Sequence, residues 1–366
     1  MEKLKDIVLK FKINAANFTV SPFGTGLIND TYKIVTPKEN FILQRINHNI
    51  FKDVDLMQNN IQRITEHIRS KGGKTLTLIT TVDDKLYYFD GTEYWRLTKF
   101  IENSRSFEQV TPELAYLTGE AFGNFQYMLS DLPGNPLGYT IPNFHNMEFR
   151  LQQLNMALTL NKAGRLNALE TILEGLVKKN ISVGEIAKEL LSRSELMCKA
   201  ERLGREGKLP KRVTHCDTKV NNVLFNSKGD FLCVIDLDTT MPGYVLSDFG
   251  DFIRTAGNTA AEDEYDTTKI SLNMDIFKSF TKGYLNTAKA FLTSIEIENL
   301  AYGAKLLTYM QAVRFFTDYI NGDTYYKIKY PQHNFVRTMA QLTLLKSIEE
   351  HEHEMNLYIK DLIDNK

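Results

Sequence analysis

The sequence predicts an α+β fold with two lobes, a small antiparallel sheet followed by a larger and mainly helical part. Three observations predict it. Strand-like segments joined by short turns fill the first hundred residues, apolar residues later recur at helical spacing over long stretches, and the short polar run Asn103 to Ser106 separates the two textures. We therefore divide the chain into an N-terminal lobe, residues 1–103, and a helical C-terminal lobe, residues 104–366.

Strands are predicted in the first lobe wherever runs of β-favouring residues lie between turn signals. The segments are 18–23, 31–35, 40–46, 75–81, 85–90 and 93–101. One helix interrupts them, because apolar residues keep the 3.6-residue period at Leu56, Met57, Ile61, Ile64 and Ile68. The pattern predicts an antiparallel sheet of about five strands with one helix inserted after the third.

Helices dominate beyond the polar run. Thr111 followed by Pro112 is typical of a helix start, with threonine as N-cap and proline at the first helical position. Long periodic segments follow near residues 146–163, 183–204, 295–321 and 334–363. The stretch VTHCDTKVNNVLFNSKGDFLCVIDLDTT, residues 213–240, is the only strand-like island that we predict in this lobe.

Composition excludes several classes of protein. The 44 Lys and Arg nearly balance 45 Asp and Glu, which argues against a bulk nucleic-acid binder or a polybasic membrane attachment. The three cysteines form no CxxC pair, which disfavours a disulfide framework or a zinc site. The first residues follow helical spacing rather than the pattern of a signal peptide. We expect a cytoplasmic protein without nucleic-acid or membrane partners, and no protein partner is predicted.

The stretch 213–240 gathers polar residues around two short apolar runs. A hairpin centred on the turn NSKGD places Asn222 opposite about Val234, with Asp236 just past the same end. His215 and Asp217 precede the first strand on that side. The register therefore predicts that these side chains meet at one end of the hairpin.

These residue types suit phosphoryl transfer. Magnesium typically takes one or two protein oxygens plus substrate phosphates, and Asn222 and Asp236 could supply them. Asp217 could accept a proton from a substrate hydroxyl, and Lys219 could neutralise charge on a phosphoryl group. Asp238 could bind a second ion or cap a turn, and the sequence leaves both open.

The motif HCDTKVNN, His215 to Asn222, matches the kinase catalytic-loop pattern H-x-D-x-K-x-x-N, and VIDLD stands where the metal-binding aspartate motif follows. In this form the chain resembles the aminoglycoside phosphotransferase and choline kinase group of small-molecule kinases. The resemblance implies a two-lobed protein-kinase-like fold, ATP as phosphoryl donor, and Mg²⁺ or Mn²⁺ as cofactor. It makes Asp217 the catalytic base at the acceptor hydroxyl, with His215 and Asp248 as structural support for the loop.

The resemblance also implies nucleotide contacts in the N-terminal lobe. They would come from GTGLIND between the first two strands and from the hinge TKFIE, and the residues are Gly24, Gly26, Asn29, Phe100 and Ile101. The third strand of such a lobe usually supplies a lysine, but FILQRIN offers Gln44 or Arg45, of which we take Arg45. Strand alternation lets only one of the two point inward. The customary helix glutamate is not evident.

The acceptor is implied by RFFTDYINGDTYY, in which Arg314 and Tyr325 resemble positions that contact the sugar in kinases of free N-acetylhexosamines. The expected reaction is ATP-dependent phosphorylation of GlcNAc or GalNAc at the anomeric hydroxyl. Three alternatives stay open: a kinase for choline, homoserine or an aminoglycoside; a nucleotide-binding pseudokinase, since the lysine–glutamate pair is missing; and, ranked well below, a glycosyltransferase whose DxD site is Asp236-Leu237-Asp238.

Overall fold

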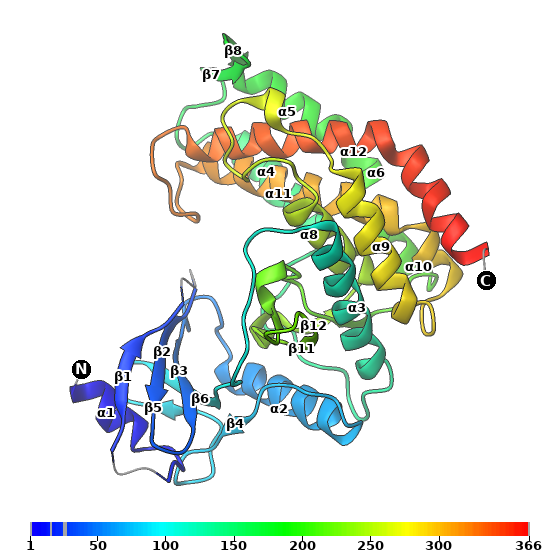
Figure 1. The fold of residues 1–366 in the computed structure, drawn as a ribbon. Helices are drawn as coiled ribbons and strands as arrows, with labels where there is room; N and C mark the ends of the chain where they lie inside the picture. The colour runs from blue at the N-terminus through cyan, green and yellow to red at the C-terminus, as the bar shows by residue number, and fades with distance from the viewer. Residues whose placement is uncertain (1, 15–16, 25–27, 365–366) are drawn as a thin grey trace. The chain divides into compact units, whose positions relative to one another are not determined.

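A computed structural model of the protein describes residues 2–14, 17–24 and 28–364 (Figure 1). Contacts along the chain divide it into two compact units. The first unit comprises Met1–Ser106, Met128–Pro142 and Asn221–Pro242, and the second comprises Phe107–Tyr127, Asn143–Val220 and Gly243–Lys366. The functional division at residues 103/104 stays a prediction, since contacts alone do not assign roles to lobes.

The first unit contains an antiparallel sheet. In the described part of the chain it has six strands, with the order β1-β2-β3-β6-β4 and with β5 paired to β6, where about five were predicted. The strands are β1 (Thr19–Pro22), β2 (Asp30–Val35), β3 (Asn40–Ile46), β4 (Leu78–Ile79), β5 (Tyr88–Phe89) and β6 (Tyr94–Lys99). The predicted inserted helix is α2 (Val54–Ser70), which follows β3 as expected.

Buried apolar residues hold this unit together. The short helix α1 (Glu2–Val8) buries Ile7 and Val8 in one cluster with strand residues such as Phe41 and Leu43. Helix α2 buries most of the predicted apolar face, and Asp53 caps its first turn by accepting from the Leu56 amide at 2.9 Å. The burial of these apolar side chains is the main stabilising contribution to the unit.

Asn60 explains why two distant segments belong to the first unit. This buried side chain of α2 donates from Nδ2 to the carbonyl oxygens of Gly138, at 2.8 Å, and Thr240, at 3.2 Å. The Gly138 amide in turn donates to Oδ1 of Asn60 at 3.1 Å. One amide side chain therefore fixes the loop 128–142 and the segment 221–242 against α2.

The second unit is helical, as predicted. Its helices are α3 (Pro112–Leu129), α4 (Met147–Leu160), α5 (Val183–Ser192), α6 (Ser194–Met197), α7 (Lys199–Arg205), α8 (Val245–Ala256), α9 (Met274–Ala288), α10 (Ser294–Glu298), α11 (Leu300–Asn321) and α12 (His333–Asp364), with the 3-10 turn η3 (Thr267–Lys269). Thr111 accepts from the Leu114 amide at 3.2 Å, which confirms the predicted start of α3. The predicted helix near 183–204 is instead three short helices.

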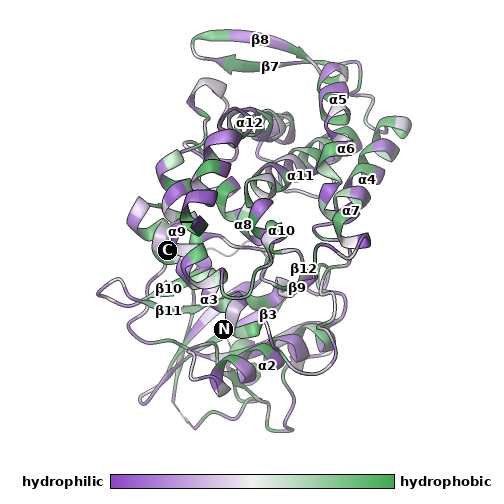
Figure 2. Cartoon of the chain, turned by 90° about the vertical axis from the view of Figure 1, so that its right-hand side faces the viewer, coloured by the Kyte–Doolittle hydropathy of each residue, from purple (hydrophilic) through white to green (hydrophobic). Residues whose placement is uncertain are grey.

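Helix α11 lies against α4, α8 and α12 (Figures 1 and 2), and most of its side chains are buried. Two glycines set its distance from α8, because a Cβ atom on Gly250 would lie 2.1 Å from the carbonyl oxygen of Gly303. The two helices can therefore approach only while both positions lack a side chain. No helix of the described residues is long and apolar enough to cross a membrane.

One expectation about the second lobe is wrong. The stretch 213–240 is not its only strand-like island, since β7 (Leu169–Glu174) and β8 (Val177–Ser182) form a hairpin beside α5 (Figure 1). Gly175 in its turn has φ +65°, a conformation that favours glycine. Most side chains of this hairpin are at least partly exposed, so it lacks the apolar alternation by which strands are recognised. Short strands also occur at β9 (Arg212–Thr214) and β12 (Met241–Gly243).

Candidate active site

The predicted hairpin is present in the first unit as β10 (Val223–Phe225) and β11 (Phe231–Val234). Its register differs by one residue from the prediction, because β11 carries one extra residue, Leu232, opposite the step from Leu224 to Phe225 on β10. The Ile235 amide donates to the Asn222 carbonyl oxygen at 2.9 Å, so Asn222 lies opposite Ile235 rather than Val234. The bulge thereby brings Asn222 one residue nearer to Asp236.

Asp236 occupies an unusual backbone conformation. Its φ of 59° and ψ of 55° are left-handed, and it directly precedes the 3-10 turn η2 (Leu237–Thr239). Few non-glycine residues adopt this conformation, although aspartate does so more readily than most, and such residues are frequent at functional sites. Asp236 is exposed, whereas Asn222 at the end of η1 (Val220–Asn222) is buried.

Asp238, two residues later, is fully engaged. Its carboxylate forms an ion pair with Nη1 of Arg96 on β6, and its other oxygen accepts from Nδ2 of Asn29 at 2.7 Å. Both side chains of the pair are almost completely buried, at 5% exposed for Arg96 and 2% for Asp238. Arg96 also donates from Nε to the side-chain oxygen of Gln44 at 2.9 Å.

The loop that carries Asp217 lies in the second unit and is organised by Asp248 of α8. The carboxylate of Asp248 accepts from the backbone amides of His215 and Cys216, both at 2.8 Å, and from Nε2 of Gln126 at 2.7 Å. Burial raises the pKa of Asp248, although these hydrogen bonds oppose the shift. Cys216 has φ 64°, so the three donors hold a sharp left-handed turn immediately before Asp217.

His215 supports the same turn. Its ring is buried, meets Phe122 and Phe125 edge-on at centroid distances of 5.5 and 5.8 Å, and accepts at Nδ1 from the Asp217 amide at 3.3 Å. This geometry suits an organiser of the loop rather than a proton carrier.

Asp217 and Lys219 lie together in this loop. Their side chains form an ion pair at 3.0 Å. Burial lowers the pKa of Lys219, but the carboxylates of Asp217 and Asp251 outweigh burial and raise it overall. Lys219 therefore remains a cation at neutral pH and can stabilise negative charge beside Asp217.

Asp251 is a residue of this site that the sequence reasoning missed. Its carboxylate accepts from the Thr218 amide at 3.1 Å and pairs with Arg254 at 2.9 Å. Burial would raise its pKa, but Arg254, Lys219 and His145 lower it below the usual value. The available signal was its spacing, since residues three apart on a helix share a face and Asp251 follows Asp248 by three.

The predicted nucleotide contacts are only partly described. Gly26 lies outside the described residues, and Gly24 has φ +76°, which favours glycine. Asn29 is buried and bonded to Asp238, as above. The Phe100 amide donates to the Asn40 carbonyl oxygen at 2.8 Å, so this amide is already used within the sheet. Their roles with nucleotide stay predictions.

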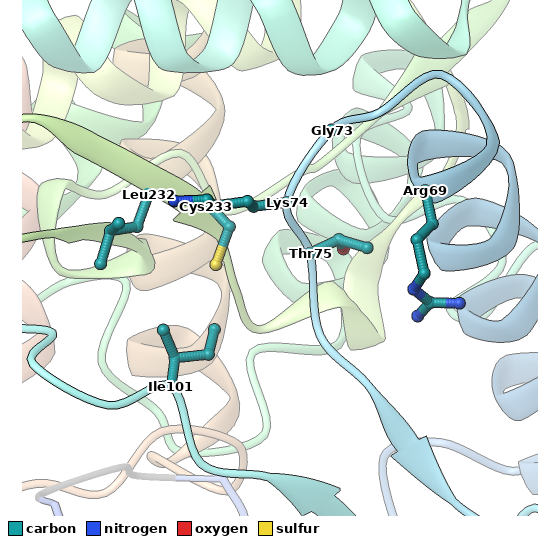
Figure 3. Close-up of a pocket in the computed structure, with 7 residues that line it drawn as sticks. All are labelled: Arg69, Gly73, Lys74, Thr75, Ile101, Leu232 and Cys233. Atoms are coloured by element: carbon teal, nitrogen blue, oxygen red, sulfur yellow. The ribbon is translucent and has the colours of Figure 1, made fainter.

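Ile101 lines a pocket of about 320 Å³ in the first unit (Figure 3). Its wall combines the end of α2 and the following loop with the strand β11, and the other lining residues are Arg69, Gly73, Lys74, Thr75, Leu232 and Cys233. The lining therefore combines apolar side chains, Ile101 and Leu232, with basic ones, Arg69 and Lys74.

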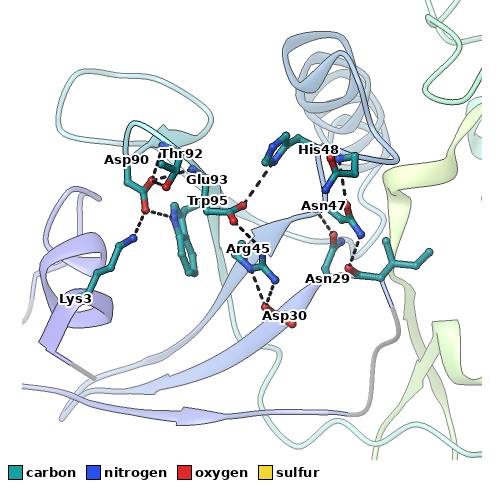
Figure 4. A network of polar contacts seen from close by, with 12 residues as sticks. Lys3, Asn29, Asp30, Arg45, Asn47, His48, Asp90, Thr92, Glu93 and Trp95 are labelled. Atoms are coloured by element: carbon teal, nitrogen blue, oxygen red, sulfur yellow. Dashed lines mark hydrogen bonds and ion pairs between the residues drawn. The ribbon is translucent and has the colours of Figure 1, made fainter. Parts of the chain in front are cut away.

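Arg45 and Gln44 point to opposite faces of β3, as alternation requires. Arg45 pairs with Asp30, at 2.7 Å from Nε, and with Glu93, at 2.9 Å from Nη1 (Figure 4). Gln44 lies on the other face, where it meets Arg96. Gln44, and not Arg45, therefore lies on the face of the sheet that contacts Asp238 through Arg96. The role of Arg45 with nucleotide stays a prediction.

The expected acceptor residues lie in the second unit. The Arg314 guanidinium on α11 lies over the rings of Phe144 and Tyr326, at 5.2 and 5.6 Å from their centroids, and donates to Gln311 at 3.0 Å. Tyr325 packs edge-on against Tyr326 at 4.8 Å and is 64% exposed. The structure thus brings Arg314 and Tyr325 to one aromatic cluster.

Asp318 explains the backbone course beside this cluster. Its buried carboxylate accepts from the amides of Tyr325, at 2.8 Å, and Tyr326, at 2.9 Å. The turn that follows α11 is therefore fixed by one side chain, and it presents both tyrosines next to Arg314.

The oxygen donors fit a magnesium ion. A carboxylate on Asp236 and an amide oxygen on Asn222 are the hard ligands that Mg²⁺ prefers. Among the described residues there is no group of three or more His, Cys, Asp or Glu placed to hold a metal. Magnesium needs no such group when it takes only one or two protein oxygens and keeps waters and substrate phosphates.

Comparison with known proteins agrees with this chemistry. A model of the phosphotransferase enzyme family matches residues 19–272. Among solved structures, choline kinase from Cryptosporidium parvum is 13% identical with a TM-score of 0.59, covering 100% of this chain and 99% of its own. An aminoglycoside phosphotransferase from Alicyclobacillus acidocaldarius is 9% identical with a TM-score of 0.60, covering 97% and 96%.

A third structure, a spectinomycin phosphotransferase in complex with ADP and spectinomycin, is 11% identical with a TM-score of 0.55, covering 96% of this chain and 98% of its own. Identities this low show the fold alone, and the predicted two-lobed α+β fold is thereby confirmed. The family match spans well over half of the sequence, and it includes both the catalytic loop HCDTKVNN and the segment VIDLD. The chain belongs to the phosphotransferase enzyme family, and it has the fold of the aminoglycoside phosphotransferases and choline kinases.

Proposed function

We propose that this protein is an N-acetylhexosamine 1-kinase, which transfers the γ-phosphoryl group of ATP to the anomeric hydroxyl of free GlcNAc or GalNAc. The observation that supports phosphoryl transfer is the geometry of the loop before Asn222. Asp248 of α8 holds the turn of this loop at Cys216, and Asp217 lies beside Lys219. The acceptor rests on the likeness of the Arg314 to Tyr325 segment to hexosamine kinases.

In this proposal Asp217 orients the sugar hydroxyl and takes its proton as the new bond forms. Lys219, which pairs with Asp217, neutralises charge on the transferred phosphoryl group. Asn222 and Asp236 would hold a magnesium ion, which would shield the charge of the nucleotide phosphates. Asp248 and His215 keep the loop in place and do not touch the reacting atoms.

The aromatic cluster of the second unit supports a sugar acceptor. Phe144, Tyr325 and Tyr326 supply aromatic rings, and Arg314, which lies over two of them, and Gln311 supply hydrogen-bond donors beside them. A sugar ring has apolar C–H faces and a polar rim, so it matches such a combination. Choline, by contrast, is a cation, and Arg314 would repel it.

The proposed reaction is tested by phosphorus NMR after incubation with ATP, Mg²⁺ and a panel of free sugars. We expect a sugar 1-phosphate signal with GlcNAc or GalNAc and none with the corresponding 1-O-methyl glycosides, in which the anomeric hydroxyl is blocked. Robust turnover of choline, homoserine or an aminoglycoside, with none of a hexosamine, would contradict the proposed acceptor.

The pseudokinase alternative is favoured by one observation, the engagement of Arg45 with Asp30 and Glu93 in place of a lysine–glutamate pair. An ADP-release assay with the same sugars separates the two functions. Release above the background hydrolysis rate identifies an enzyme, and nucleotide binding without release identifies a pseudokinase.

The Arg314→Ala and Tyr325→Ala variants should raise KM for the sugar by about tenfold while KM for ATP changes little. The reason is that contacts made equally in ground and transition states appear in KM, and one or two hydrogen bonds to a ligand contribute about 1.4 kcal/mol, a factor of ten. Steady-state kinetics with each substrate varied in turn measures this. Arg205→Ala, at an exposed arginine paired with Glu148, is the matched control. Equal rises in both constants would count against a sugar contact.

A further inference from the structure

A buried polar network in the first unit ties the sheet to the segment after Asp236. Arg96 on β6 contacts Asp238 with Nη1 and Gln44 on β3 with Nε, and Gln44 donates onward to Thr31 on β2 at 3.2 Å. Three neighbouring strands thus contribute to one chain of contacts that ends at η2. A pair of charges this deeply buried costs much desolvation free energy, so each charge depends on the other.

Asn29 gives the network a second route. It donates to the remaining oxygen of Asp238 at 2.7 Å and accepts from the Asn47 amide at 2.9 Å (Figure 4). Asn29 lies directly before β2 and Asn47 directly after β3. The carboxylate of Asp238 is therefore bonded on both oxygens, to a cation and to an amide, which leaves it poorly suited to be a ligand of a second metal ion.

The network is attached to the backbone segment that directly follows Asp236. Asp236 is left-handed, and the next three residues form η2. On the far side of η2, the Thr240 carbonyl oxygen accepts from Asn60 of α2. The short segment is thus held at Asp238 by the sheet and at Thr240 by the helix, two and four residues after Asp236.

We propose that Arg96 and Asp238 are positioning residues, whose ion pair fixes Asp236 in the orientation that binds magnesium. This inference rests on the proposed function of Asp236. Residues that orient a metal ligand typically change metal affinity or activity by roughly 10- to 100-fold when they are replaced. Arg96 lies on β6 opposite Gln44 of β3, on the face of the sheet that meets Asp238. In this proposal Arg96 acts on the metal ligand Asp236 through Asp238.

The test uses Arg96→Leu, Asp238→Leu and the double variant. Each single variant leaves one buried charge unpaired and should unfold at a lower temperature. The double variant replaces the pair with apolar side chains, which is often neutral for stability, so its melting temperature should return to within a few degrees of wild type. We expect its Mg²⁺ requirement nevertheless to rise by about tenfold or more, with KM for the sugar unchanged.

Two readouts follow magnesium: the Mg²⁺ concentration for half-maximal rate, and the gain in ADP affinity on adding Mg²⁺, measured by calorimetry. Lys305→Met is the control for loss of a buried cation, since Lys305 on α11 pairs with Glu352 on α12 and should leave the Mg²⁺ requirement unchanged. Asp238→Asn keeps the size of the side chain and should raise the requirement in the same direction.

A stable double variant with wild-type Mg²⁺ dependence would overturn the inference and show the pair to be purely structural. If Asp238 were instead a second metal ligand, Asp238→Leu would weaken Mg²⁺ binding while Arg96→Leu would not, which also overturns it. A wild-type protein whose ADP affinity ignores Mg²⁺ would overturn the proposed function, and this inference with it.

Discussion

Asp236→Ala should remove nearly all phosphoryl transfer at ordinary magnesium concentrations, a loss of about 10³-fold or more. A metal ion at a transferring phosphoryl group contributes several kcal/mol of charge stabilisation, and about 4 kcal/mol corresponds to a factor of 10³ in rate. Alanine removes the carboxylate, and we do not expect Asp238 to take its place, because its carboxylate is held by Arg96 and Asn29.

The measurement is initial rate against Mg²⁺ concentration, with the melting temperature of each variant. Asp230→Ala is the matched control, because Asp230 is an aspartate of the same hairpin that bonds within its turn, to Asn226. Asn222→Ala should do less harm than Asp236→Ala, since water can partly replace a neutral ligand. Full activity of Asp236→Ala at ordinary magnesium would place the metal site elsewhere.

The order of elements could be predicted because each carries a local signal. Apolar residues at helical spacing located α2, and Thr111 located the start of α3. The hairpin after the catalytic loop followed from its turn, NSKGD, but its register did not. A bulge adds one residue to β11, and the sequence marks no position for it. Asn222 was therefore predicted to lie opposite about Val234, whereas it lies opposite Ile235.

Contacts between distant segments were not predictable from local patterns. Arg96 and Asp238 are 142 residues apart, and nothing in YWRLTKF or VIDLD shows that the two meet. A charged residue within a strand whose neighbours are buried was the one available signal, since Trp95 and Leu97 flank Arg96. The same limit left the choice between Gln44 and Arg45 open, and only the partners of each side chain assign their faces.

The catalytic-loop motif could be recognised in the sequence, but the residue that supports it could not be found from local patterns. His215 to Asn222 is continuous in sequence, so its residue types could be matched directly, while the boundary between the compact units falls inside it, after Val220. The turn at Cys216 depends on Asp248, which follows 32 residues later and whose spacing to the loop no local rule fixes. Resemblance to the family supplied Asp248, whereas the hairpin register and the chemistry of the residue types had already pointed to Asp217, Asn222 and Asp236.

Asp217→Asn should fold, bind ATP with magnesium, and lose turnover by roughly 10²–10⁴-fold, the usual span for a positioned acid or base. Asparagine keeps the shape of the side chain and an oxygen that can accept a hydrogen bond, but it cannot take the proton of the sugar hydroxyl. The fold should tolerate the change because the ion pair that is lost, to a Lys219 that is 48% exposed, contributes little to stability. The turn itself is held by Asp248 through backbone amides, which the substitution leaves intact.

Calorimetric nucleotide binding and single-turnover kinetics on the same variant decide the role of Asp217. In a loose phosphoryl-transfer transition state the proton leaves late, so orientation of the hydroxyl contributes as well as basicity. The asparagine side chain would preserve part of that orientation, and we therefore expect Asp217→Ala to lose more turnover than Asp217→Asn. The matched control is Asp275→Asn, at an exposed aspartate in the first turn of α9. Nucleotide binding lost together with turnover would make Asp217 a structural residue, and turnover retained within a few-fold would remove it as the base.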